Sequence, residues 1–125
     1  MAYIFHITTR EQWAQAEQDG QYQADSLSSD GFIHCSTPEQ VVKVANEYYE
    51  GQHGLVLLCV DTEQLGSELR YEDPAGVVFE PGEQFPHVYG PINVEAVVKV
   101  IGLEPGYDGR FGAPGKTVYL GSSDR

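Results

Sequence analysis

The chain has 125 residues, of which 41% are hydrophobic and 21% charged, as is usual for one globular domain and unlike a disordered chain. Its 19 acidic and 7 basic residues give a formal net charge of −12. Proteins that bind nucleic acids or anionic membranes cluster Lys and Arg, whereas the basic residues here are scattered. The composition therefore argues against a nucleic-acid or membrane partner, and leaves room for one Arg beside an anionic small molecule.

No targeting or membrane-spanning signal is visible. The N-terminus lacks a charged segment followed by an apolar run, and the longest apolar run, residues 55–60, is too short to span a bilayer. We therefore expect a cytoplasmic protein. Cys35 and Cys59 each lie in an apolar stretch, and we interpret both as buried side chains rather than as a disulfide.

The N-terminal residues predict a strand followed by a short helix. Residues 3–7 are aromatic and β-branched, which favours a strand. Thr9 and Gln12 form a capping-box pattern, and Gly20 is placed to end the helix that they begin.

A second strand and a stronger helix follow. Residues 31–36 predict the strand. Thr37 is then expected as N-cap, with Pro38 at the first helical position and Gln40 three residues after the cap. The helix is predicted over residues 37–49, and Gly51 ends it.

The second half of the chain predicts strands separated by loops. Residues 55–60 indicate a fully buried strand, and residues 69–72 a brief one. The stretch 73–86 is rich in Pro and Gly and is expected to be a loop, within which residues 77–79 could pair as an edge. A final strand is expected over residues 96–103.

Strands outnumber helices and show no regular βαβ alternation. We therefore expect a single α+β domain over residues 1–104, built from a curved, mainly antiparallel sheet that could be split in two, with two short helices packed on it. Residues 105–125 are rich in Gly and polar side chains, and we expect them to form a weakly ordered tail.

Three of the four histidines lie in or beside predicted strands. These are His6, His34 and His87, whereas His53 lies in a Gly-rich loop. A strand histidine is often just a partly buried imidazole with one backbone hydrogen bond, which is the plain alternative for each. Three such residues, each beside turn-forming or small polar residues, favour a shared site.

The second histidine motif adds an anion-binding feature. Alternation places Phe32, His34 and Ser36 on one face of their strand. Ser36 runs into the N-terminus of the helix predicted from Thr37, where free N–H groups favour an anion. A phosphate near Ser36 is therefore expected, the alternative being that Ser36 and Thr37 only cap the helix.

The third motif is Phe-Pro-His-Val-Tyr-Gly-Pro at residues 85–91. Its prolines stiffen the segment around His87 and Tyr89, and Gly90 permits close backbone approach. Glu72 is a carboxylate at a probable strand end just before the preceding loop, and a plain surface carboxylate is the alternative interpretation.

With the strings Tyr-Ile-Phe-His-Ile-Thr (3–8), Gly-Phe-Ile-His-Cys-Ser (31–36) and Phe-Pro-His-Val-Tyr-Gly (85–90), the chain resembles a widespread family of small bacterial proteins, domain-of-unknown-function family nine-five-two. The resemblance covers residues 3–101. That family is distantly similar to ADP-ribosyltransferase-like folds, and the order of parts resembles the RNA 2′-phosphotransferases of that superfamily.

The resemblance implies roles for several residues. The superfamily strings Tyr-His-Gly-Thr and His-x-Ser are matched by residues 5–8 and 34–36. The match implies that the first strand contacts NAD or its ribose and that the second shapes the nucleotide pocket. The residues expected to bind the nucleotide are His6, Thr8, Phe32, Ser36 and Tyr89.

The chain also departs from those enzymes. The phosphotransferases hold phosphates with several arginines, whereas only Arg10 and Arg70 fall in the matched region. The glutamate of true ADP-ribosyltransferases has Glu72 as its nearest counterpart.

Three functions follow as hypotheses. The first is an NAD- or nucleotide-handling enzyme, with His34, Glu72 and His87 as catalytic residues, NAD as substrate and no metal. The second is a non-catalytic module in which the same cleft binds a nucleotide or small metabolite. The third is a metal-binding protein, in which the three histidines join Glu72 or Cys35.

Overall fold

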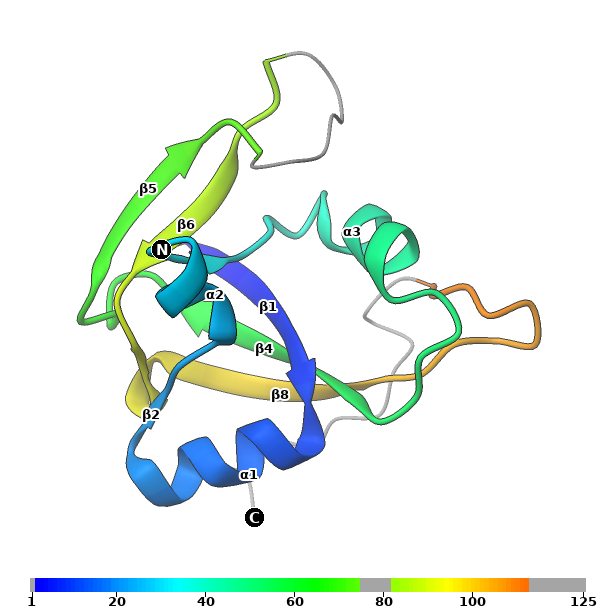
Figure 1. Cartoon of the computed structure of the whole chain (residues 1–125), viewed down its shortest axis with the longest axis horizontal. Helices are drawn as coiled ribbons and strands as arrows, with labels where there is room; N and C mark the ends of the chain where they lie inside the picture. The colour runs from blue at the N-terminus through cyan, green and yellow to red at the C-terminus, as the bar shows by residue number, and fades with distance from the viewer. Residues whose placement is uncertain (1, 75–81, 113–125) are drawn as a thin grey trace.

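The computed structural model describes residues 2–74 and 82–112. Eight strands, three α-helices and one 3-10 helix (η1) are found there, in an order that mixes short helices with short strands (Figure 1). In chain order they are β1 (Tyr3–Thr9), α1 (Arg10–Asp19), β2 (Gln21–Tyr22), α2 (Asp25–Ser29), β3 (Ile33–His34), α3 (Val41–Tyr48), β4 (Leu55–Asp61), β5 (Glu68–Glu72), β6 (Phe85–Tyr89), β7 (Ile92–Asn93), η1 (Val94–Ala96) and β8 (Val97–Leu103).

The strands form three antiparallel sheets. The first has the order β1-β4-β8, the second pairs β2 with β7, and the third has the order β3-β6-β5. An isolated bridge between Phe5 of β1 and Ser36, just after β3, joins the edges of the two larger sheets. The prediction of mainly antiparallel pairing in a divided sheet is therefore confirmed.

β4 is the centre of the molecule, because every residue from Leu55 to Asp61 is buried. Its side chains alternate between two apolar clusters. Val56 and Leu58 face a cluster that includes Trp13 of α1, whereas Leu55 and Leu57 face a cluster under α3. A strand buried on both faces must be apolar throughout, and this is why its sequence predicted it directly.

α1 has the caps that its sequence predicted. The side chain of Thr9 accepts a hydrogen bond from the backbone N–H of Gln12, and Gly20 ends the helix in the left-handed conformation. Trp13 and Ala16 are its buried residues. These local signals lie within one helix, and they therefore required no knowledge of the rest of the fold.

The prediction of two helices was wrong, because α2 forms where none was expected. The second predicted helix also begins later: residues 37–40 form a turn, and α3 starts at Val41. The predicted contact between Gln40 and the backbone N–H of Thr37 does form, at 3.0 Å. Gln40 also donates to the backbone oxygen of Gln84 at 2.8 Å, which ties this turn to the approach to β6. None of the helices within the described ranges is long and apolar enough to cross a membrane.

The chain beyond β8 returns to α3. Asn46 holds the backbone of Phe111 at both ends, accepting from its N–H at 2.8 Å and donating to its oxygen at 3.2 Å. Phe111 is buried in the cluster under α3. Phe111 of the predicted tail therefore packs on the domain, while residues 113–125 and the expected edge at 77–79 lie outside the described residues.

Candidate functional site

Strand register brings the second and third histidine motifs together. His34 of β3 lies opposite His87 of β6. The next residue, Cys35, donates its N–H to Pro86, so the two histidines form a non-hydrogen-bonded pair, in which side chains lie closest. Their ring centroids are 5.6 Å apart. We call His34 and His87 the open pair.

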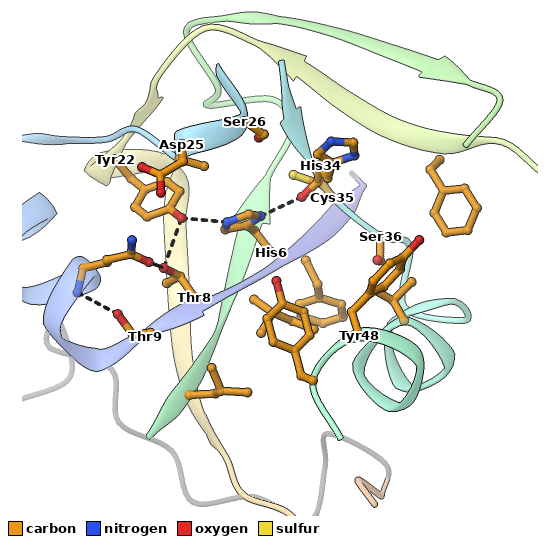
Figure 2. Close-up of a pocket in the computed structure, with 18 of the residues that line it drawn as sticks. His6, Thr8, Thr9, Tyr22, Asp25, Ser26, His34, Cys35, Ser36 and Tyr48 are labelled. Carbon is orange, nitrogen blue, oxygen red and sulfur yellow. Dashed lines mark hydrogen bonds between the residues drawn. The ribbon is translucent and has the colours of Figure 1, made fainter. Parts of the chain in front are cut away.

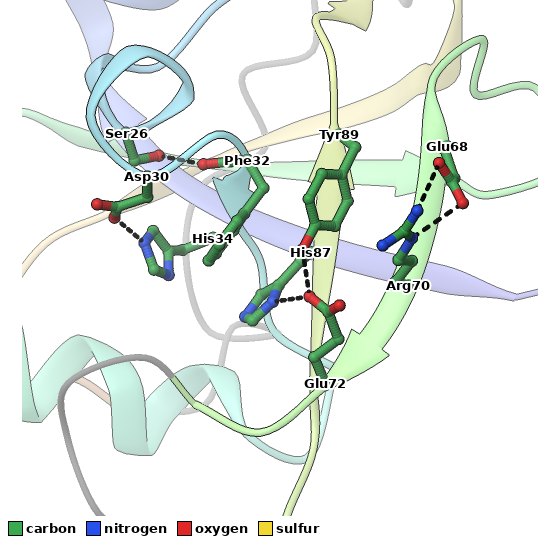
Figure 3. Close-up of polar contacts among 9 residues, drawn as sticks. All are labelled: Ser26, Asp30, Phe32, His34, Glu68, Arg70, Glu72, His87 and Tyr89. Atoms are coloured by element: carbon green, nitrogen blue, oxygen red, sulfur yellow. Dashed lines mark hydrogen bonds and ion pairs between the residues drawn. The ribbon is translucent and has the colours of Figure 1, made fainter.

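Glu72 orients His87. It lies on β5 opposite Phe85, diagonal to His87 on the same face of the sheet. Oε1 of Glu72 lies 2.7 Å from Nδ1 of His87 and accepts a second hydrogen bond from the Tyr89 hydroxyl at 2.6 Å (Figure 3). Bonds from Tyr89 and then His87 lower the pKa of Glu72. An ionised Glu72 can only accept, so Nδ1 of His87 carries a proton, and whenever the ring is neutral its Nε2 is an acceptor.

Aromatic stacking fixes the His87 ring as well. Phe32 stacks on it with centroids 4.0 Å apart and an interplanar angle of 20°. The guanidinium of Arg70 lies over the ring of Tyr89, 4.7 Å from its centroid, and is paired with Glu68. The side chain of His87 is 3% exposed as a result.

His34 is held differently from its partner. Its Nε2 lies 2.8 Å from Oδ2 of Asp30, in a turn four residues earlier, and the hydrogen bond lowers the pKa of Asp30. The His34 side chain is 43% exposed. The open pair therefore combines a buried imidazole with an exposed one, and each has its own carboxylate.

His6 lies in a separate group of buried polar side chains, which we call the closed cluster and which consists of His6, Thr8, Gln12 and Tyr22. Nδ1 of His6 lies 2.6 Å from the backbone oxygen of His34, and Nε2 lies 2.8 Å from the Tyr22 hydroxyl (Figure 2). The Tyr22 hydroxyl lies 3.0 Å from the Thr8 hydroxyl, which in turn lies 2.6 Å from the side-chain amide oxygen of Gln12. Every member is thus bonded within the protein.

Burial sets the charge of the closed cluster. It lowers the pKa of His6 from 6.5 to about 4 and raises that of Tyr22 to about 12, so the imidazole is neutral and the phenol protonated at neutral pH. A carbonyl oxygen can only accept, so Nδ1 of His6 donates to His34. His6 therefore links β1 to the backbone of a residue in the open pair.

A pocket of about 520 Å³ lies where the two sheets meet, which is the size of an ordinary small-molecule site. His6, His34 and His87 all line it, together with Thr8 and Ser36. Tyr48 and Tyr49, at the end of α3, contribute aromatic surface. The three predicted histidine motifs thus converge on one cavity.

Two polar atoms of largely buried residues at this pocket have no protein partner. Within residues 2–74 and 82–112, neither Nε2 of His87 nor Oγ of Ser36 makes a hydrogen bond, although the residues are 2% and 4% exposed. No fully buried side-chain nitrogen or oxygen in the described residues lacks a partner, so these two atoms reach solvent through the pocket, where a ligand could bond to them.

The backbone around Ser36 does not offer the anion site expected from the sequence. The N–H of Ser36 donates to Phe5 at 2.8 Å, and the N–H of Thr37 donates to the Gln40 side chain. α3 begins five residues after Ser36. The two amides that were expected to hold a phosphate are therefore occupied by protein acceptors.

Cysteine and metal chemistry find little support among the described residues. Cys35 and Cys59 are buried free thiols, as predicted, and burial raises the pKa of Cys35, which makes it a poor nucleophile. No group of three or more His, Cys, Asp or Glu in the described ranges is arranged to hold a metal ion. His53 is exposed and paired with Glu104 on the surface.

The predicted site residues thus divide into three kinds. His34, His87 and Ser36 present polar groups to the pocket; His6 and Thr8 line it with their polar atoms engaged; Phe32, Glu72 and Tyr89 support His87 from behind. Sequence reasoning missed Asp30 and the side-chain roles of Gln12 and Tyr22. The sequence did carry one signal for Asp30, because a carboxylate four residues before a histidine can pair with it.

Comparison with known proteins identifies a family and solved structures similar to this chain. Residues 7–100 match the family described as "Protein of unknown function (DUF952)". A crystal structure of the protein CC0527 from Caulobacter crescentus has 35% identity and a TM-score of 0.78, covering 89% of this chain and 94% of that one. Its solution NMR structure has 36% identity and a TM-score of 0.73, covering 88% and 91%.

A crystal structure of a double mutant of the same Caulobacter crescentus protein has 34% identity and a TM-score of 0.77, with coverage of 89% and 94%. A search among curated proteins finds no match. Since the family model spans residues 7–100, which is most of the chain and includes the motifs of His34 and His87, the chain belongs to the family described as "Protein of unknown function (DUF952)".

Proposed function

We propose that this protein is an enzyme that acts at the ribose of a nucleotide, with NAD as the first substrate to test. The observation that supports the proposal is the imidazole of His87: buried, held at Nδ1 by Glu72, and with Nε2 unpaired at a pocket of ligand size. A structural histidine uses both nitrogens, as His6 does. A base held by an orienting carboxylate is the arrangement that activates a nucleophile.

The chemistry follows from this geometry. The bond between C1′ of the ribose and the nicotinamide nitrogen breaks, and its electron pair neutralises the positive ring. The oxygen of a water molecule bonds to C1′, and its proton passes to Nε2 of His87. Glu72 stabilises the resulting imidazolium through Nδ1. An acceptor hydroxyl in place of water would make the same step an ADP-ribosyl transfer.

The remaining wall of the pocket suits a ribose. Nδ1 of His34 and Oγ of Ser36 make no hydrogen bond within the described residues, and both residues line the pocket. They supply the polar contacts that hydroxyl groups require. The resemblance to ADP-ribosyltransferase-like folds is part of the proposal, because the matched segments 5–8 and 34–36 both line this cavity.

The test combines binding with turnover. NAD is titrated into isotope-labelled protein while backbone amide signals are followed, and nicotinamide release is measured for the wild type, His87→Ala and the surface control His53→Ala. We expect saturable shifts around residues 34–36 and His87. His87→Ala should lose about 100- to 10,000-fold in turnover with NAD affinity changed little, and His53→Ala should match the wild type.

Two results would count against an enzyme. Saturable shifts without any nicotinamide release would make the pocket a nucleotide-binding module. An absence of shifts at millimolar NAD would mean that the resemblance reports fold alone. Metal analysis of protein purified without a His-tag would then test the third hypothesis, which needs stoichiometric metal.

A further inference from the structure

The charge of the pocket wall determines which part of a nucleotide the pocket can bind. Among the described residues that line the cavity, Asp25 and Asp30 are the acidic ones, and none is Lys or Arg. The basic side chains nearest in sequence to the site elements are committed elsewhere: Arg10 to Glu104, Lys43 to Glu83 and Arg70 to Glu68. Sites that hold phosphates use Arg, Lys or free backbone N–H groups, and the amides after β3 are already occupied.

The unpaired atoms in the same wall belong to a hydroxyl and an imidazole. Oγ of Ser36 and Nε2 of His87 have no protein partner among the described residues, and both residues line the cavity. Neutral hydroxyl and imidazole groups complement sugar hydroxyls rather than a phosphate dianion. Tyr48, labelled beside Ser36 in Figure 2, adds an aromatic side chain against which a positive ring is favoured.

We infer that the pocket takes a phosphate-free nucleoside whose base carries a positive charge, and that any phosphates of a larger substrate stay outside it in solvent. This inference rests on the proposed function and names the part of the nucleotide that is recognised. Of NAD, the nicotinamide riboside half would fill the cavity. Asp25 and Asp30 attract the cationic ring and repel a phosphate brought to the same wall.

Calorimetric titration of the full chain with nicotinamide riboside, its 5′-monophosphate, NAD and AMP tests the inference. We expect the riboside to bind at least about tenfold more tightly than its monophosphate, and AMP to bind most weakly. Raising the salt concentration should narrow the gap between riboside and monophosphate, because the repulsion is screened.

Asp25 offers a direct charge reversal. It is exposed at the start of α2, so its replacement should leave the fold intact. Asp25→Lys should weaken riboside binding about tenfold and strengthen monophosphate binding. Glu17→Lys, an equal change of net charge on an exposed position of α1 away from the pocket, should leave the order of affinities unchanged.

The outcomes separate the inference from the function on which it rests. Binding of the monophosphate, NAD or AMP as tight as that of the riboside overturns the inference and leaves a nucleotide enzyme standing. An equal response to Asp25→Lys and Glu17→Lys also overturns it, because a long-range effect of net charge would then explain the preference. Binding of none of the four compounds overturns the proposed function together with the inference.

Discussion

His6 and His87 line the same pocket and are almost equally buried, but the protein uses their ring nitrogens differently. Both nitrogens of His6 are bonded to protein atoms in the closed cluster. Only Nδ1 of His87 is bonded within the described residues, to Glu72. Residue type and burial are thus insufficient to separate a fully bonded histidine from one with a nitrogen left open at the pocket. The number of ring nitrogens bonded within the protein separates them, because a nitrogen left unbonded at a pocket can still bond to a ligand.

The comparison predicts its largest effect in stability. His6→Ala removes the side-chain partner of the His34 carbonyl and one of the two partners of the Tyr22 hydroxyl, and it leaves a cavity. A buried group left without a partner costs about 1–3 kcal/mol, and a buried ring replaced by Ala adds a cost for the cavity. We therefore expect a loss of about 4 kcal/mol in the free energy of unfolding, measured in urea. His87→Ala should cost less, since Glu72 is partly exposed and can bind water. Equal losses for both variants would remove the distinction between the two histidines.

The closed cluster should also control the response to acid. The pKa of His6 is about 4 in the folded protein and near 6.5 when unfolded, so between these values the unfolded chain binds the extra proton. Stability is complete above pH 6.5 and falls towards pH 4, by about 3 kcal/mol.

His6→Gln should flatten that part of the profile, as measured by urea unfolding at several pH values. Asp30 and Glu72 also have lowered pKa values and lose stability in the same direction, so the difference between variant and wild type isolates His6. His53→Gln, on the surface, should keep the wild-type slope. A His6→Gln profile parallel to the wild type would show that His6 is charged in the folded state.

Removing one hydroxyl from each group, Thr8 or Ser36, should change the free energy of unfolding by smaller amounts. Thr8→Val deletes an engaged hydroxyl of the closed cluster and should destabilise by about 2 kcal/mol. Ser36→Ala deletes a hydroxyl without a partner in the described chain and should change stability by less than about 0.5 kcal/mol or increase it. Thermal unfolding of the two variants side by side decides the point, and a large loss for Ser36→Ala would assign that hydroxyl a structural role.

The smallest expected effect is on the pKa of Glu72, the carboxylate that bonds His87. The hydrogen bond from Tyr89 is the main cause that lowers the pKa of Glu72, so Tyr89→Phe should raise that pKa, as read from carbon NMR of the carboxyl group. As the pH falls, Glu72 should then be protonated, and its bond to His87 weakened, at a higher pH than in the wild type. Tyr71→Phe, on an exposed position of the same β5 strand, should leave the pKa unchanged.

Local signals allowed part of the fold to be predicted. β4 was predicted because both of its faces are buried, and α1 because Thr9, Gln12 and Gly20 carry its caps within the helix itself. β2 and β7 were missed because each has two residues, too few to show a period, and they pair residues about seventy positions apart. Such strands are fixed by tertiary contacts.

The start of α3 and the details of the site depended on the same distant contacts. The side chain of Gln40 bonds the N–H of Thr37, as the capping pattern predicted. It also bonds the backbone oxygen of Gln84, and this long-range contact holds residues 37–40 as a turn instead of a first helical turn. The histidine motifs identified the residues that meet at the pocket. The register that sets His34 against His87, and the engagement of His6 by Tyr22, follow from strand pairing and burial that no single motif contains.

The bridge between Phe5 and Ser36 has a consequence for how this pocket moves. Two backbone hydrogen bonds, of 2.7 and 2.8 Å, and the contact from His6 to the His34 carbonyl join one sheet to the other at the pocket wall. Breaking them would widen the cavity while leaving the ladders of both sheets intact. The amide hydrogens of Phe5 and Ser36 should therefore exchange with solvent sooner than those of β4, and their exchange rate measures how often the pocket opens.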